Sequence, residues 1–159
     1  GIVCGIGSDT FPLNMIDELR TACYAGRVLA GDFTAVSTAH AFTAATVGGA
    51  AILRRPDLGR LAAGAKADLV VVDLKHPYMR PAREPLRSLV YSAGERAIRD
   101  VYVDGVQVVR EGKVLTIDVG AALDALDEAQ ARALAQAPAR DWAKRTADRL
   151  SPPVFPAGA

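Results

Sequence analysis

The stretch from 98 to 118, IRDVYVDGVQVVREGKVLTID, constrains the fold more than any other part of the chain. Its valine-rich runs alternate with polar residues, a pattern that is typical of half-buried strands. Asp104 and Gly105 stand between two of these runs, and an Asp-Gly pair in that position is among the strongest short signals for a hairpin. Glu111 and Gly112 mark a second reversal. The sequence therefore predicts an antiparallel meander whose strands are close together in sequence.

A different kind of strand is predicted at the start of the chain. Residues 1–8, GIVCGIGS, are apolar on both alternating faces, as in a parallel strand that is covered on two sides. Gly5 and Gly7 would weaken an isolated strand, so they indicate that another backbone, a bulky neighbour or a ligand comes close. The run ends on Asp9, and in barrels of parallel strands and helices the catalytic groups project from such strand ends. The alternative is that Asp9 only caps a turn by accepting hydrogen bonds from nearby amides.

Two helices are predicted between this run and the meander. Asn14 is a good N-cap, acidic residues follow it in the first turn, and Gly31 provides a C-terminal stop. A second helix is expected near 38–53, capped by Ser37 or Thr38. Its small residues would allow close packing against another element: Ala41, Ala44, Ala45, Gly48 and Gly49.

The remaining elements follow in a simple order. A strand is predicted from 67 to 74, and a short helix or turn from 83 to 93. Asp118 is a plausible N-cap for a helix that Pro138 would break or kink, and a last helix is expected from about 139 to 150. The longer of these helices carries an apolar stripe: Leu123, Leu126, Ala133, Leu134 and Ala137.

Composition excludes several classes of function. The 159 residues suffice for about one domain, and the net charge of +1 gives no electrostatic footprint for nucleic acid or an anionic membrane surface. No apolar stretch approaches the roughly 18 to 20 residues that cross a bilayer. We therefore expect neither nucleic acid nor a membrane as a partner. Cys4 and Cys23 lack C-x-x-C spacing, which favours a reducing cytoplasmic compartment, and Cys4 is expected to be a small buried hydrophobe.

Three segments occur in a characteristic order: GIGSDTFPLNMIDELRTA, AFTAATVGGAAIL and DLGRLAAGAKADLVVVDL. In that order they resemble the amidohydrolase superfamily, most of all the branch that holds cytosine deaminase, atrazine chlorohydrolase and S-adenosylhomocysteine deaminase. The resemblance implies an α/β metal-dependent hydrolase built on a (β/α)8 TIM barrel. Residues 1–58 would hold the last barrel strand and the following helices. Residues 59–117 would hold the C-terminal part of a small β-sandwich domain, and 118–159 the C-terminal helices and tail.

The same resemblance implies a role for Asp9. In the family, the matching aspartate binds a divalent metal, zinc or alternatively iron, and hydrogen-bonds the metal-bound water. A metal makes hydroxide available near neutral pH, and a carboxylate beside it can accept a proton and pass it to a departing amine. The implied reaction removes an amino group or a halide from a heterocycle such as a purine, pyrimidine or triazine. Phe11 and Leu13 could contact such a flat substrate, or could equally pack under a loop.

The other metal ligands of the family are not found in this sequence. They are an H-x-H pair and two single histidines, whereas this chain has only His40 and His76. We expect His40 to be a packed or interface residue and His76 to lie on the surface. One carboxylate is not a metal site, and a whole barrel takes about 250 residues. The chain is therefore expected to be the C-terminal portion of a longer enzyme, inactive without the missing N-terminal barrel portion.

A function of another class stays open at this point. The meander and the alanine-rich helices could form a self-contained, non-catalytic α+β structural or assembly module, in which Asp9 is only a turn cap. Cooperative unfolding of the isolated chain as a monomer would favour this alternative. In either case the alanine-rich helices could pack against another subunit of a homo-oligomer.

Overall fold

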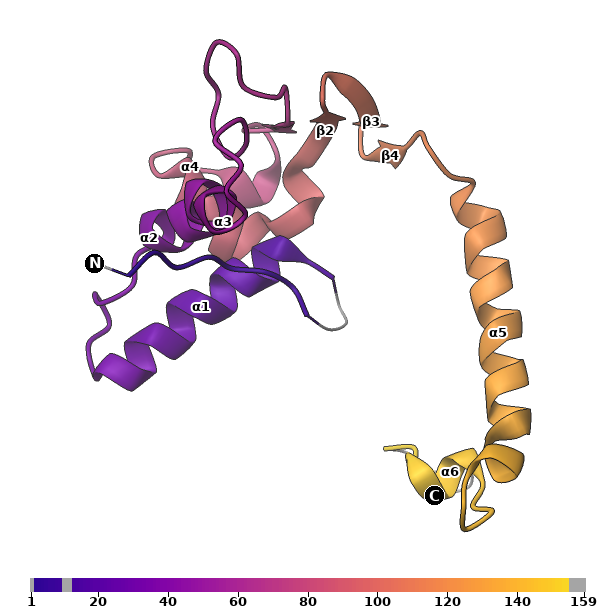
Figure 1. The fold of residues 1–159 in the computed structure, drawn as a ribbon. Helices are drawn as coiled ribbons and strands as arrows, with labels where there is room; N and C mark the ends of the chain where they lie inside the picture. Colours follow the sequence, from indigo (N-terminus) through magenta and orange to yellow (C-terminus); the bar gives the residue numbers. More distant parts are fainter. Residues whose placement is uncertain (1, 10–12, 155–159) are drawn as a thin grey trace. The chain divides into compact units, whose positions relative to one another are not determined.

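Figure 1 shows the fold in a computed structural model that describes residues 2–9 and 13–154. The chain forms two compact units, Gly1–Thr116 and Ile117–Ala159. The α-helices are α1 (Met15–Ala30), α2 (Thr38–Thr43), α3 (Gly49–Ile52), α4 (Pro85–Ser88), α5 (Val119–Arg140) and α6 (Ala147–Leu150). Shorter turns of π- or 3₁₀-helix are η1 (Ala44–Gly48), η2 (Pro77–Met79), η3 (Leu89–Ala93) and η4 (Gly94–Ala97). The strands are β1 (Leu69–Val72), β2 (Ile98–Val103), β3 (Val106–Arg110) and β4 (Lys113–Val114).

Helix α1 begins and ends where the sequence predicts. The Asn14 side chain accepts a hydrogen bond from the backbone N–H of Ile16 at 3.0 Å, which satisfies one of the free amides of the first turn. At the other end, Gly31 adopts a left-handed φ of +62°, and its N–H donates to the carbonyls of Arg27 and Val28. Both predicted caps of this helix are therefore confirmed.

The predicted second helix is a helical run, α2–η1–α3, with a π-helical turn in its middle. Ser37 is its N-cap, because its hydroxyl accepts from the N–H of His40 at 3.1 Å. The imidazole Nδ1 of His40 in turn accepts from the N–H of Ser37 at 3.4 Å, which completes a capping box. His40 is exposed and serves the cap. The expectation that it packs inside this chain is wrong, whereas the alternative that it lies at an interface stays a prediction.

The prediction of a buried strand at the start of the chain is wrong for this structure. Residues 2–9 form neither helix nor strand, and Ile2 is 94% exposed. Cys4 is exposed as well. The physical reason is that a strand must pair its backbone groups with neighbours. Within the described part of the chain, β1 to β4 pair only among themselves.

The N-terminal segment lies instead directly on the helical run (Figure 1). A Cβ on Gly48 would overlap the carbonyl oxygen of Cys4, and a Cβ on Gly5 would come within 3.3 Å of the Cα of Gly49. The predicted close approach is therefore confirmed at Gly5. At Gly7 the same construction meets nothing within 4 Å.

The predicted meander is confirmed in full. The sheet has the order β1-β2-β3-β4 with every pair antiparallel, so β1 is an edge strand. Asp104 and Gly105 take φ values of +50° and +81° between β2 and β3, as a two-residue hairpin turn requires. Glu111 and Gly112 repeat the pattern, at +49° and +74°, before β4.

The buried residues of the first unit form two clusters. In one, Leu19 and Cys23 of α1 pack with Ala41 of α2 and Val90 of η3. The other brings together three fully buried residues from η2, η3 and η4: Met79, Ala93 and Ala97. The segment 89–97 therefore contributes to both clusters and supports α1 as well as the sheet that follows it.

The second unit departs from the predicted pattern at its end. The Asp118 side chain caps α5, as expected, but α5 continues through Pro138 to Arg140. Of the helix expected from 139 to 150, only the last turn forms, as α6. Before it, the carboxylate of Asp141 accepts hydrogen bonds from nearby backbone amides and from the Arg145 guanidinium in a turn. None of the helices in the ranges 2–9 and 13–154 is both long and apolar enough to cross a membrane.

The contact between the N-terminal segment and the helix yields a direct test. We expect Gly48→Ala to lower the free energy of unfolding of the purified chain by about 1–3 kcal/mol, and with it the thermal midpoint, because the new methyl group overlaps the Cys4 carbonyl. The matched control is Gly49→Ala, whose Cβ meets only an ordinary contact at 3.7 Å. That change should stabilise the helix by roughly 0.5–1 kcal/mol. Circular dichroism melts measure both, and equal shifts of the same sign would contradict the contact.

Candidate functional site

Asp9 ends the N-terminal segment and is exposed. The residue expected beside it as a substrate contact, Phe11, lies outside the described residues. Leu13, the second expected contact, is 76% exposed just before the start of α1. Among the described residues, Asp9 and Leu13 are thus available to solvent and are not enclosed by other side chains.

The start of helix α1 is held by polar contacts to a distant part of the chain. The Nδ2 group of Asn14 donates to the Glu95 carboxylate at 3.1 Å. Six residues further along, Nε of Arg20 donates to the carbonyl of Val90 at 2.7 Å, and its guanidinium also pairs with Asp17. The first turns of α1 are therefore attached to the segment 89–97 through two independent polar contacts.

Glu95 is the ionisable partner in the first of these contacts. Its own backbone amide and the Asn14 side chain both donate to the carboxylate, and together they lower the pKa of Glu95. The carboxylate is therefore ionised near neutral pH, which is the form that accepts hydrogen bonds. It is exposed, so its contribution to overall stability is small.

The donor groups of this chain do not make a complete metal site. Residues 2–9 and 13–154 contain no group of three His, Cys, Asp or Glu side chains that could hold a metal ion, and the residues outside these ranges are of other types. Nδ1 of His40 is used in the Ser37 cap, and Nδ1 of His76 accepts from the N–H of Tyr78 at 3.3 Å. A catalytic zinc takes about three protein ligands. The described residues therefore do not form a catalytic zinc site by themselves.

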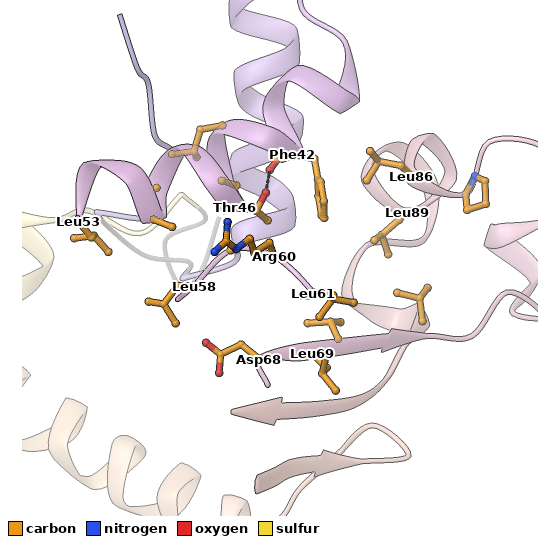
Figure 2. Close-up of a pocket in the computed structure, with 18 of the residues that line it drawn as sticks. Phe42, Thr46, Leu53, Leu58, Arg60, Leu61, Asp68, Leu69, Leu86 and Leu89 are labelled. Atoms are coloured by element: carbon orange, nitrogen blue, oxygen red, sulfur yellow. Dashed lines mark hydrogen bonds between the residues drawn. The ribbon is translucent and has the colours of Figure 1, made fainter. Parts of the chain in front are cut away.

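The first unit contains a cavity of about 810 Å³ (Figure 2). Figure 2 shows Phe42, Leu61, Leu69 and Leu86 around it, from the helical run, the 58–61 loop, β1 and α4. Its volume is in the range of small-molecule sites, yet Asp9 does not line it.

Two polar side chains of this cavity, Thr46 and Asp68, already bond to the backbone, and Arg60 is a further polar residue in its lining. The Thr46 hydroxyl donates to the carbonyl of Phe42 at 2.7 Å, and the Asp68 carboxylate accepts from the N–H of Asp104 at 2.8 Å. The cavity therefore offers apolar surface and no free nucleophile or base of its own among these groups. Sequence reasoning did not predict it, because its walls come from four segments that are far apart in the chain.

Comparisons with known proteins place this geometry in context. Residues 1–108 match the model of the Amidohydrolase family. A 5-methylthioadenosine/S-adenosylhomocysteine deaminase of Natronomonas pharaonis is 38% identical over 125 residues, which are 76% of this chain and 29% of that protein.

Solved structures give the same picture. An adenosine deaminase from Xanthomonas campestris with bound zinc superimposes with a TM-score of 0.71 and 33% identity, over 76% of this chain and 28% of the other. A mutant of atrazine chlorohydrolase from Arthrobacter aurescens, complexed with zinc and atraton, superimposes with a TM-score of 0.71 and 25% identity. The match covers 80% of this chain and 30% of that protein. The chain therefore spans less than a third of the length of each of these relatives.

The incomplete donor set predicts how the chain behaves toward zinc. We expect the purified 159-residue chain, loaded with zinc and then dialysed, to retain far less than a stoichiometric amount, because one carboxylate holds the ion too weakly. Atomic absorption measures the retained metal. The Asp9→Asn chain should retain the same trace amount, and stoichiometric retention by the unmodified chain would show that a full ligand set is present.

Proposed function

This chain belongs to the amidohydrolase family, and we propose that the protein that carries it hydrolyses the bond between a ring carbon and an amino group of a heterocycle. The match over residues 1–108 supports this proposal, as do relatives named as deaminases of adenosine-type compounds. Because one structural relative is a chlorohydrolase, a halide bound to the ring is the alternative leaving group in this proposal. A purely structural module fits these relatives poorly, because they are named as enzymes.

The family has a TIM-barrel enzyme fold, of which this chain carries mixed helices and a four-stranded antiparallel sheet. We assign residues 1–58 to the last barrel strand and its following helices, and 59–117 to the C-terminal part of a small β-sandwich. Residues 118–159 are the C-terminal helices and tail. In this assignment the remaining barrel strands flank residues 2–9 and supply the pairing that the isolated segment lacks.

Asp9 is the residue that carries the chemistry in this proposal. Its carboxylate provides one oxygen ligand to a divalent metal, with zinc favoured by the zinc-bound structures of relatives. When bound, such a metal supplies an activated water near neutral pH. The Asp9 carboxylate accepts a proton from the attacking water and delivers it to the departing amine nitrogen, so the same group acts first as base and then as acid.

The loop after Asp9 supplies apolar contacts for a flat ring in this proposal. Leu13 is suited to this role, since it is 76% exposed only four residues after Asp9, and Phe11 is proposed beside it. The substrate is a small heterocycle. A cytoplasmic setting agrees with the two cysteines, Cys4 and Cys23, which are both free.

The decisive test changes Asp9 in the protein that carries this chain. We expect Asp9→Asn to lower kcat/KM for release of ammonia from aminated purines, pyrimidines and triazines by roughly a hundred- to ten-thousand-fold, since the amide cannot shuttle a proton. The matched control is Asp124→Asn on α5, an exposed carboxylate, which should retain full turnover. Undiminished turnover in Asp9→Asn would remove Asp9 from the mechanism.

A second substitution tests the substrate contact. We expect Leu13→Ala to raise KM roughly tenfold with little change in kcat, because an apolar contact to the ring is equally strong in the ground state and the transition state. The control is Leu29→Ala, which removes an 88% exposed leucine near the other end of α1. Steady-state kinetics on the best substrate of the panel measure both variants. An unchanged KM for Leu13→Ala would show that this side chain packs elsewhere.

A further inference from the structure

Helix α5 of the second unit presents an apolar stripe to solvent. None of its 22 residues, all of which the structure describes, is buried. Four large apolar side chains form the stripe, and each is more than 40% exposed: Val119, Leu123, Leu126 and Leu134. At about 100° per residue, these four side chains fall within an arc of roughly 80° on one side of the helix. The stripe is therefore one continuous surface and not a set of scattered residues.

The charges of α5 are divided between its two halves. The first half carries only acidic side chains and the second only basic ones: Asp124, Asp127 and Glu128, then Arg132 and Arg140. Within the helix, Arg132 pairs with Glu128 at 3.4 Å, and such an exposed pair contributes little to stability. The division of charge is therefore available to a partner whose charges run in the opposite direction.

A second copy of α5 has the required pattern when it lies antiparallel to the first. Its basic half is then beside the acidic half of the first copy, and the two helix dipoles oppose each other. A parallel pair would place like charges at the same level, which is unfavourable. The charges of α5 therefore favour an antiparallel copy of the same helix as the occupant of the stripe.

Gln130 defines the register of such a pair. It lies in the middle of the stripe, four residues after Leu126 and four before Leu134. When the two Gln130 side chains meet on a two-fold axis, Leu126 of each copy faces Leu134 of the other. The two amides can hydrogen-bond to each other, and a single polar pair in an apolar seam selects one register. Arg140 then lies within one turn of Asp118 of the second copy.

We propose that the α5 stripe is a dimerisation surface, at which two copies of this chain pair antiparallel across Gln130. This pairing is independent of the role of Asp9. Two helices of 22 residues make an interface at the small end of the range. We therefore expect a reversible dimer with a dissociation constant of about 10 µM.

Two adjacent substitutions test the surface in the protein that carries this chain. Leu126→Glu places a charge in the stripe, whereas Ala125→Glu places the same charge on the far side of the helix. We expect Leu126→Glu to raise the dissociation constant at least about tenfold and Ala125→Glu to leave it within about twofold. Sedimentation equilibrium measures the constant, and circular dichroism checks that both variants keep their helix content. Equal changes in the two variants, or no dimer up to about 100 µM, would overturn the proposal.

Disulfide cross-linking tests the direction and the register. In a Cys4→Ser background, which removes the exposed thiol of this chain, Gln130→Cys should form a linked dimer under mild oxidation because the two positions meet on the axis. Leu123→Cys should link only when it is mixed with Ala137→Cys, and Ala135→Cys on the far side should not link. Self-linkage of Leu123→Cys would show a parallel pair. A Gln130→Cys thiol that reagents cannot reach in a monomer would show that another part of the protein covers the stripe, and either result would overturn the proposal.

Discussion

The structure of the N-terminal segment depends on the absence of a side chain at Gly48. Because no Cβ stands in the way, the Cys4 carbonyl lies against the helix, and Gly5 reaches the backbone of Gly49. A barrel strand would be fixed on both sides by hydrogen bonds to its neighbours. Here the close approaches of Cys4 and Gly5 to the helical run hold the segment, together with the packing of Ile6 against the first core cluster.

Helix α1 provides the complementary constraint, and it does so with apolar and polar contacts that agree. Leu19 and Cys23 bury their side chains against Val90, while Arg20 donates to the carbonyl of that same valine. The segment 89–97 then leads directly into β2. Helix α1 and the antiparallel sheet therefore share one support, and a disturbance of that support affects both.

Helix caps and turns could be predicted from the sequence, whereas strand pairing and contacts between distant residues could not. The Asn14 cap and the turn at Gly105 follow from residues within a few positions, so the sequence predicted both correctly. Residues 1–8 were predicted as a buried strand, but pairing depends on neighbours that local sequence does not contain. The bond to Glu95 joins positions 81 apart and leaves no periodic pattern. The role of Asp9 was inferred from family resemblance, and its companion ligands could not be found because one carboxylate does not specify a metal centre.

The edge position of β1 has a consequence for the chain in isolation. One side of this strand pairs with β2, and no other strand of residues 2–9 and 13–154 pairs with its other side, where Val70 is 57% exposed. Such an edge is a template on which a strand of a second molecule can add. We therefore expect the isolated polypeptide to self-associate at high concentration unless another segment covers that edge.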